Sequence, residues 1–220
     1  MATNVHPLAH LVSRVERSLR NGHRGAVIWL TGLSGAGKST LAMAVERRLF
    51  AHGSFVYVLD GDNVRGGLNR DLGFSAADRT ENIRRVGEVA ALFADAGTIV
   101  ITAFISPFRK DREMAREAAG SAFHEIYLSA DLQTCEARDP KGLYRRARQG
   151  EIPDFTGISS PYETPAAPEL KLDTGGTTLE ECVDRLFAYI VSATTDGVEA
   201  ERIAREKRSS RSARERSAFS

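Results

Sequence analysis

The sequence is short of cysteine, of excess charge of either sign and of long apolar runs. Its 220 residues contain two cysteines, Cys135 and Cys182, each within an apolar periodic stretch, and this favours two buried, reduced thiols over a disulfide or a metal pair. Lys and Arg number 30 and Asp and Glu 29, so the net charge of +1 argues against a nucleic-acid or anionic-membrane partner. No apolar run approaches the roughly 20 residues that are needed to span a bilayer.

Two further absences bear on location and on metals. Residues 1–20 lack the continuous apolar core and the small-residue cleavage site of a secretory signal, which together with reduced cysteines predicts a cytoplasmic protein. The five histidines, at positions 6, 10, 23, 52 and 124, have no metal-ligand spacing. What remains is an ordinary globular composition, 42% hydrophobic and 27% charged, in a chain long enough for one α/β domain and a tail.

Apolar patterning predicts strands that alternate with helices. Segments between the strands carry apolar residues at helical spacing, and such alternation gives a mostly parallel sheet with helices on both faces. We therefore predict a three-layer α/β/α fold with five strands. Continuous β-type apolar runs place these strands at residues 26–31, 55–60, 98–105, 124–129 and 169–174.

Local signals also indicate where helices start. Apolar residues at helical spacing predict an N-terminal helix within residues 1–24, packed against the main domain. Asp78 with Glu81, and Thr178 with Glu181, have the spacing of a capping box. Each pair therefore predicts a helix that begins directly after its first residue.

Three segments lack apolar periodicity. Residues 61–78 carry glycines and charges, and we expect a long functional loop there. Residues 139–168 are rich in proline and predict a lid or a disordered segment. After a main domain at residues 25–192, mixed Arg and Glu with few large apolar residues predict a polar, disordered tail at residues 193–220.

The octet GLSGAGKS after the first strand has the spacing G-x-x-x-x-G-K-[ST] of a phosphate-binding loop. Its glycines let backbone N–H groups point at phosphate oxygens, and the next helix adds its positive N-terminal end. Lys38 is expected to reach the β- and γ-phosphates of ATP, and the Ser39 hydroxyl to bind Mg²⁺. The predicted ATP-binding residues here are Gly32, Leu33, Ser34, Gly35, Ala36, Gly37, Lys38, Ser39 and Thr40.

The second strand ends in DGDNVR, which places two carboxylates where ligands bind parallel sheets. Asp62 is the better candidate to orient or deprotonate an acceptor hydroxyl, and either Asp60 or Asp62 could hold the metal through water. The alternative is that these residues only cap a turn, because Asp often does so after a strand.

A cluster of arginines and one aromatic residue follows. Arg65 and Arg79 can bind phosphate-like or sulfate-like oxygens in a bidentate manner, while an exposed Phe74 can stack on a base. Asn82 lies in the same stretch. The alternative is a solvated loop with Phe74 inserted into the core.

Seven segments together resemble the adenylyl-sulfate kinase (APS kinase) family: GLSGAGKST, DGDNVR, LNRDLGFS, DRTENIRR, FISPFRKDR, RDPKGLYRRAR and FTGISSPYE. They occur in the family's order between about residues 27 and 190, and FISPFR and DPKGLY are more specific than the phosphate loop. The resemblance implies a P-loop NTPase-type fold with a lid. It also implies transfer of the ATP γ-phosphoryl group to the 3′-hydroxyl of adenosine 5′-phosphosulfate (APS).

The resemblance also assigns roles to residues. Phe74 and Phe155 are expected to sandwich the adenine of APS, and Lys141 to bring a positive charge to the transferring group. Arg138 and Thr177 are expected near the adenine of ATP. The implied acceptor-binding residues are Asp62, Arg65, Phe74, Arg79, Asn82, Ile105, Ser106, Lys141 and Phe155.

Ser106 is open to two interpretations. In the family this serine is described as a phosphoserine intermediate, which implies a catalytic location for it. No histidine or other evident base lies near it in the sequence, so its hydroxyl could instead bind a phosphate or the water shell of the metal. Arg109 and Lys110 either help to close the site or are exposed cations. Gly66 departs from the family, which usually carries a larger polar residue there.

The resemblance further implies a homodimer and allows association with a sulfurylase. One rival interpretation is a related P-loop kinase that phosphorylates another nucleotide-like or sugar hydroxyl. Another is a non-catalytic ATP-binding module that acts through residues 193–220. Deletion of those residues distinguishes a kinase from a binding module, because turnover survives in a kinase and partner binding is lost in a module.

Overall fold

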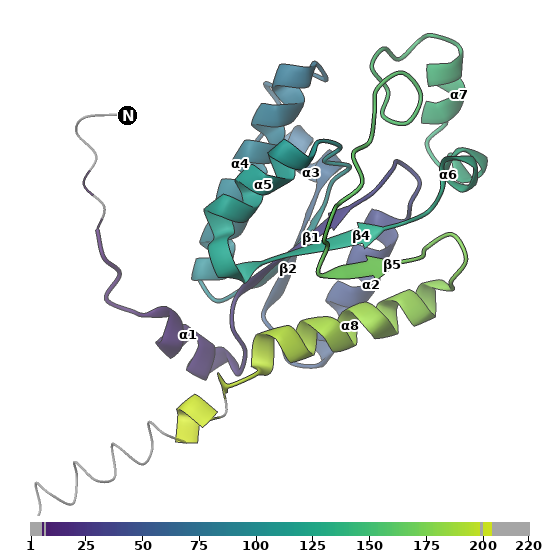
Figure 1. Ribbon diagram of the computed structural model, residues 1–220. Helices are drawn as coiled ribbons and strands as arrows, with labels where there is room; N and C mark the ends of the chain where they lie inside the picture. Colours follow the sequence, from purple (N-terminus) through teal and green to yellow (C-terminus); the bar gives the residue numbers. More distant parts are fainter. Residues whose placement is uncertain (1–5, 7, 199, 204–220) are drawn as a thin grey trace, which may run out of the picture.

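Five parallel strands form one sheet in the order β2-β3-β1-β4-β5. The computed structural model describes residue 6 and residues 8–198 and 200–203 (Figure 1). The sheet and its parallel pairing confirm the predicted architecture. Its strands are β1 (Ala26–Thr31), β2 (Val56–Asp60), β3 (Ile99–Ala103), β4 (Phe123–Leu128) and β5 (Leu170–Leu172).

Helices cover both faces of this sheet, and a 3₁₀ turn at Gly120–Ala122 leads into β4. The α-helices are α1 (Arg14–Asn21), α2 (Lys38–Ala51), α3 (Gly61–Gly66), α4 (Ala76–Asp95), α5 (Arg109–Ala119), α6 (Leu132–Arg138), α7 (Leu143–Arg148) and α8 (Leu179–Thr195). Among the described residues, no helix has the length and apolar character that crossing a membrane requires.

The central strand β1 shows why the layers form. All six of its residues are buried, as a strand covered on both faces requires. Ile28 and Leu30 pack with the cluster under α2 and α8. Val27 and Trp29 alternate with them and pack with the cluster under α4 and α5. The two-residue period of the strand therefore divides one apolar run between two cores.

Strand register brings three loops to the same edge of the sheet. Leu30 of β1 and Asp60 of β2 both pair with Ala103 of β3. The segments that follow these strands therefore begin side by side. They are the phosphate loop, the DGDNVR segment and the FISP turn (residues 104–107).

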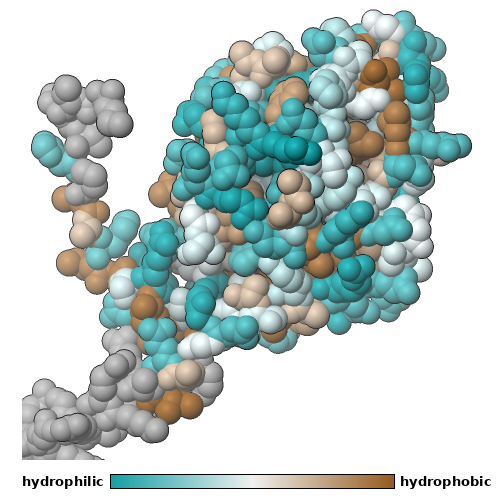
Figure 2. Space-filling view, viewed as in Figure 1, coloured by the Kyte–Doolittle hydropathy of each residue, from teal (hydrophilic) through white to brown (hydrophobic). Residues whose placement is uncertain are grey.

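The N-terminal helix is shorter than the apolar spacing predicts. It begins at Arg14, where Ser13 and Glu16 form a capping box, and not near residue 8. Leu8 and Leu11 are 92% and 101% exposed, so they do not pack on the domain. Figure 2 shows brown, apolar side chains along this segment, which stands apart from the domain body.

The region between β2 and α4 is also more ordered than predicted. α3 occupies the start of the expected loop, with Asp60 as its N-cap. The prediction that Asp78 caps the next helix is wrong, because Ser75 is the N-cap and its hydroxyl accepts from the backbone N–H of Asp78. Glu81 instead contacts Arg84 and Arg85.

The segment at residues 139–168, here called the lid, contains α7 and has a packed interior. Tyr144 and Phe155 are buried, and their rings meet edge to face with the centroids 5.0 Å apart. At the other end of the domain, α8 runs past residue 192 to Thr195 with its predicted Thr178–Glu181 capping box. The predicted tail boundary at residue 193 is therefore too early, and residues 204–220 lie outside the described part of the chain.

Candidate active site

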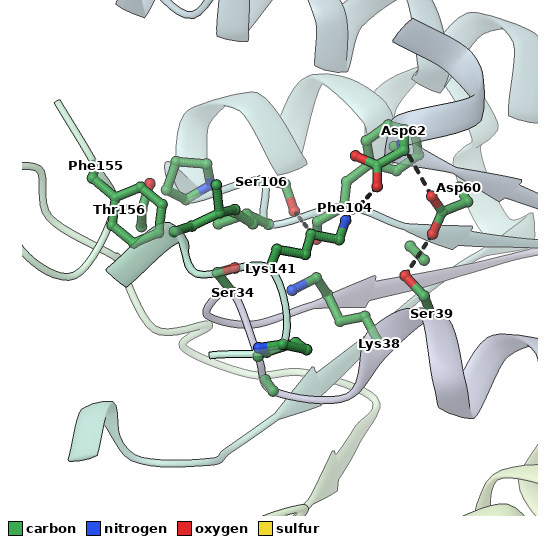
Figure 3. A pocket seen from close by; sticks show the side chains of 18 of the residues that line it. Ser34, Lys38, Ser39, Asp60, Asp62, Phe104, Ser106, Lys141, Phe155 and Thr156 are labelled. Atoms are coloured by element: carbon green, nitrogen blue, oxygen red, sulfur yellow. Dashed lines mark hydrogen bonds and ion pairs between the residues drawn. The ribbon is translucent and has the colours of Figure 1, made fainter. Parts of the chain in front are cut away.

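The carboxyl edge of the sheet opens into a cavity of about 1420 Å³ (Figure 3). Its walls are the phosphate loop, the start of α3, the FISP turn and the lid. Pockets for one small ligand commonly measure roughly 300–1,000 Å³, so this cavity has room for two nucleotide-sized molecules.

Cys135 and Cys182 are buried free thiols, as predicted.

The phosphate loop has the backbone its glycines were expected to allow. Gly35 and Gly37 have φ of 74° and 91°, in the left-handed region that disfavours side chains. A Cβ at Gly35 would also lie 2.8 Å from the carbonyl oxygen of Cys135. Both glycines are therefore required for the curl that presents the N-terminus of α2 to the cavity.

Lys38, the first residue of α2, folds back over this loop. Its Nζ donates to the carbonyl oxygens of Gly32 and Leu33, at 2.8 and 2.7 Å. Burial of the ammonium group lowers the pKa of Lys38 to about 8. An anionic phosphate in the loop would offset this desolvation, so the side chain is suited to bind one.

Ser39 and Asp60 contact each other in the cavity and together offer a hydroxyl and a carboxylate. The Ser39 hydroxyl donates to Asp60 Oδ2 at 2.6 Å, and Asp60 Oδ1 accepts from the backbone N–H of Asp62 at 3.0 Å. Among the described residues, no group of three or more His, Cys, Asp or Glu could hold a metal ion. Mg²⁺ that arrives with a nucleotide needs only one or two protein oxygens, so a hydroxyl and a carboxylate fit it.

Asp62 is turned away from that pair and toward the lid. Its carboxylate forms an ion pair with Lys141 Nζ, drawn as a dashed line in Figure 3. Both side chains are largely exposed, so water screens their attraction. Lys141 can therefore leave Asp62 at little cost when a phosphate competes for it.

Arg65 and Phe74 lie together on the cavity wall. The Arg65 guanidinium centre is 4.3 Å from the Phe74 ring centroid, and its Nη1 donates to the Gly73 carbonyl at 2.9 Å. Phe74 is 67% exposed, so the alternative in which it is inserted into the core is wrong. An exposed ring beside a guanidinium suits a ligand that combines a base with an anion.

Arg79 joins α4 to the lid. Its guanidinium donates to the Asp154 carbonyl at 2.6 Å, to Thr156 Oγ1 at 3.0 Å and to the Phe74 carbonyl at 2.9 Å. Asn82, one turn further along α4, is buried and accepts from Asn69 Nδ2 at 3.0 Å. Arg79 thus holds the lid in this structure and must exchange those contacts to bind an anion.

Phe155 reaches the cavity from the lid and lines it together with Phe74. It is 7% exposed and lies against Tyr144. The Tyr144 hydroxyl donates to the Ser34 carbonyl of the phosphate loop at 2.9 Å. The lid aromatic residues are therefore connected directly to the loop that would hold ATP.

Ser106 lies at the cavity wall with φ of 40°, a strained conformation for a residue with a side chain. Such strain costs about 1–3 kcal/mol and persists only where neighbours hold it. Trp29 Nε1 donates to Ser106 Oγ at 3.1 Å, and Ser106 Oγ donates to Thr31 Oγ1 at 3.1 Å. A hydroxyl engaged on both sides and 2% exposed is better placed to hold the turn than to attack a phosphate.

Arg138 and Thr177 line the same cavity. Arg138 Nη2 donates to the Thr174 carbonyl at 2.7 Å, and the Thr174 hydroxyl donates to the Ala36 carbonyl at 2.8 Å. This arrangement fixes the segment after β5 against the phosphate loop. Both residues therefore line the cavity beside the phosphate loop, and their contact with the adenine of ATP stays a prediction.

Comparison with known proteins decides the family. The family model described as adenylylsulphate kinase matches residues 24–173. An adenylyl-sulfate kinase of Bacillus licheniformis is 60% identical over 184 residues, which is 83% of this chain and 93% of that protein. One of Bacillus velezensis is 61% identical over 180 residues, 81% of this chain and 91% of that protein. The chain belongs to the adenylylsulphate kinase family.

Solved structures of this family share the fold. An APS kinase of Mycobacterium tuberculosis in complex with AMPPNP and APS has a TM-score of 0.72 and 50% identity, over 75% of this chain and 96% of that one. A hexameric APS kinase from Thiobacillus denitrificans has a TM-score of 0.58 and 36% identity, over 76% of this chain and 29% of that one. The predicted three-layer fold is thus confirmed by proteins of the same family.

All the predicted site residues line one cavity, except Gly32 and Leu33 of the phosphate loop. Of the expected phosphate-loop residues, Ser34 to Thr40 line it, while Gly32 and Leu33 act through their carbonyls on Lys38. Ile105 lines it beside Ser106. Arg109 and Lys110 are exposed and do not line it.

Sequence reasoning missed residues that hold the site from behind. Thr156 accepts from Arg79, and Trp29 and Thr31 hold Ser106. Arg112 was not singled out, although it donates to the Ser106 carbonyl at 2.7 Å. The only sequence signal for Arg112 is that it is the last residue of the segment FISPFRKDR. Local spacing could not show that a residue of α5 contacts the FISP turn and the lid.

Proposed function

We propose that this chain transfers the γ-phosphoryl group of ATP to the 3′-hydroxyl of APS, giving 3′-phosphoadenosine 5′-phosphosulfate and ADP. The observation that carries the proposal is that one cavity is lined both by the phosphate loop and by Asp62, Arg65 and Phe74. A phosphoryl donor and a nucleotide-like acceptor can therefore meet in one cavity. Family membership agrees with this activity.

In the proposed complex, ATP lies along the phosphate loop with its adenine near Arg138 and Thr177. Loop N–H groups and Lys38 hold the β- and γ-phosphates. Ser39 and, through water, Asp60 would hold Mg²⁺, and their side chains already contact each other. The ion would neutralise charge that develops on the transferring group.

The acceptor lies on the opposite side of the cavity. Phe74 and Phe155 would stack on its adenine, and Arg65 and Arg79 would bind its phosphosulfate oxygens. Asn82 and Ile105 complete this wall. Because Arg79 contacts the lid at Asp154 and Thr156 in this structure, acceptor binding is expected to shift the lid.

Asp62 is the group proposed to orient and deprotonate the acceptor hydroxyl. In this structure Lys141 occupies its carboxylate. When the γ-phosphate attracts Lys141, Asp62 becomes free to accept the proton, and the ammonium group stabilises the charge of the transferring phosphoryl group. Lid closure at the same time excludes water and limits ATP hydrolysis.

We also propose that the protein forms a homodimer. A hexameric relative indicates that self-association occurs in the family. The cytoplasmic location and the association with a sulfurylase stay predictions from the sequence. An analytical ultracentrifugation run on the full chain tests the dimer, and a monomer at micromolar concentration would contradict it.

The activity is tested by ADP release from Mg-ATP, measured with and without APS. We expect release that depends on APS, and a fall in kcat of about 10²–10⁴-fold in Asp62→Asn, which keeps the shape but removes the base. Asp71→Asn is the matched control, because Asp71 is an exposed carboxylate nearby that pairs with Arg85 and does not line the cavity.

Other outcomes would contradict the proposal. ADP release that does not change with APS would show a hydrolase, and faster release with a sugar or another nucleoside would favour the rival kinase. Equal losses in Asp62→Asn and Asp71→Asn would remove Asp62 from the proposed role.

A further inference from the structure

Arg112 of α5 carries a buried charge with three acceptors from three parts of the chain. Its side chain is 3% exposed. Nε donates to Glu125 Oε1 at 2.5 Å, Nη1 to the Ser106 carbonyl at 2.7 Å and Nη2 to the Glu163 carbonyl at 2.7 Å. A buried guanidinium is tolerated only when it is paired and hydrogen-bonded, so these contacts fix its position closely.

The first two contacts connect the sheet to the FISP turn. Glu125 lies on β4, which is paired on both sides, with β1 and with β5. Ser106 has a strained backbone at φ of 40°, which its neighbours must maintain. Arg112 holds the carbonyl of this residue, while Trp29 and Thr31 hold its hydroxyl.

The third contact extends the same unit to the end of the lid. The backbone N–H of Glu163 donates to the Pro107 carbonyl at 2.8 Å, and Glu163 Oε2 accepts from the backbone N–H of Arg109 at 2.7 Å. Next to it, the Tyr162 hydroxyl is 2.9 Å from Thr31 Oγ1. The FISP turn and residues 162–164 are therefore joined on several sides, with the Arg112 guanidinium between them.

We propose that Arg112 is a positioning residue for phosphoryl transfer, which aligns the FISP turn and the base of the lid as one unit. The proposal rests on the proposed function. Arg112 does not line the cavity, so it touches neither substrate there. It acts on the cavity wall through Ile105 and Ser106, and on the end of the lid through Glu163.

This arrangement predicts a selective defect. The phosphate loop follows β1 and makes no hydrogen bond to Arg112, so ATP binding depends little on it. The acceptor wall and the lid both depend on it. Loss of the three hydrogen bonds of the Arg112 guanidinium should therefore weaken APS binding and let water compete for the γ-phosphoryl group. KM for ATP should change little.

The test compares Arg112→Lys with Arg116→Lys. Lysine keeps the charge opposite Glu125 but cannot supply three donors in a fork. Arg116 lies one turn further along α5, pairs with Glu169 at 2.6 Å and approaches Glu125 at 3.7 Å, but reaches neither the turn nor the lid. It is therefore a matched control for the loss of an arginine ion pair on the same helix.

In Arg112→Lys we expect KM for APS to rise about ten- to a hundredfold. This is the effect expected from the loss of one or two hydrogen bonds to a charged group. KM for ATP should stay within about threefold, and ADP release should exceed formation of the phosphorylated product. In Arg116→Lys the two products should form in equal amounts. The product ratio is the decisive measurement, because a loss of stability alone does not change it.

An Arg112→Lys enzyme that keeps equal product amounts and an unchanged KM for APS would overturn the proposal. So would equal rises in both KM values. If Arg112→Lys does not fold, Tyr162→Phe tests the same unit by removing the hydroxyl bonded to Thr31, and an unchanged product ratio there would also overturn it. A wild-type enzyme with no response to APS would instead refute the proposed function.

Discussion

Lys38 makes binding of ATP sensitive to pH in a range where most lysines are insensitive. Its Nζ is buried against two loop carbonyls, and burial lowers its pKa from 10.5 to about 8. Only the protonated side chain attracts the β- and γ-phosphates. The perturbation is therefore a rise in pH from 7 to 9, without any mutation.

The size of the effect follows from the pKa. At about 8, the protonated fraction is about 0.9 at pH 7 and about 0.1 at pH 9, so affinity for ATP should fall about tenfold, or ~1.4 kcal/mol. Bound phosphates favour the charged form, so kcat should lack this decline while kcat/KM for ATP shows it.

Stability should respond in the opposite direction. Because the pKa of Lys38 is lowered in the folded state, the unfolded chain binds more protons between pH 8 and 10.5. The contribution of this group to the free energy of unfolding therefore rises with pH in that window. Affinity for ATP and stability of the ligand-free protein should diverge there.

Calorimetric titration with a non-hydrolysable ATP analogue and Mg²⁺ at pH 7, 8 and 9 measures the effect. Lys38→Met is the control, because it keeps the length of the side chain without a titrating group, and its weak affinity should not depend on pH. A flat wild-type profile would refute the reasoning. The same slope in Lys38→Met would assign the titration to another group.

Three other changes test separate parts of the site. Ser106→Ala should leave the Trp29 indole without its acceptor and lower the free energy of unfolding by about 1–3 kcal/mol in urea, yet retain turnover; a phosphoserine in the mass spectrum of the wild type would contradict this. Lys141→Ala should lower kcat about 10²-fold with KM for ATP nearly unchanged, and a change in KM alone would argue against its role on the transferring group. Gly66→Ala should raise the free energy of unfolding by about 0.4–1 kcal/mol in a thermal melt, because a Cβ there meets no atom within 4 Å, and a lower melting temperature would show a hidden constraint.

The elements predicted correctly are those whose signals are local. The apolar run at residues 26–31 and the glycine spacing after it determine β1, the phosphate loop and α2 within one continuous stretch. Thr178 and Glu181 likewise lie three residues apart and form their capping box as predicted. In each case the interacting atoms belong to neighbouring residues, so spacing alone is sufficient.

Predictions failed where two local signals compete or where burial decides. Ser75 and Asp78 can each cap a helix, and the choice of Ser75 leaves Glu81 to pair with arginines. Apolar spacing before α1 resembles a helix, but Leu8 and Leu11 have no surface of the domain to cover, and the helix begins where Ser13 can cap it. A sequence pattern alone does not show which of two possible N-caps is used, or whether an apolar face has a surface to pack against.

The state of the site depends on contacts between distant residues. Lys141 lies 79 positions from Asp62, and Thr156 lies 77 positions from Arg79. Motifs could indicate that these residues share a site, because each lies in a segment that resembles the family. They could not indicate that Lys141 holds Asp62, or that Arg79 binds the lid, since those pairings come from the tertiary fold.

The central claim is that the γ-phosphoryl group of ATP passes to the 3′-hydroxyl of APS in this cavity. The most direct test supplies ATP that carries ¹⁸O in its γ-phosphoryl group, together with APS and Mg²⁺, and locates the labelled phosphate by its isotope shift in phosphorus NMR. We predict labelled phosphate bonded to the 3′-carbon oxygen of the nucleotide phosphosulfate, and none in Asp62→Asn within the same time. Label found only in inorganic phosphate, on the protein or on another oxygen would contradict it.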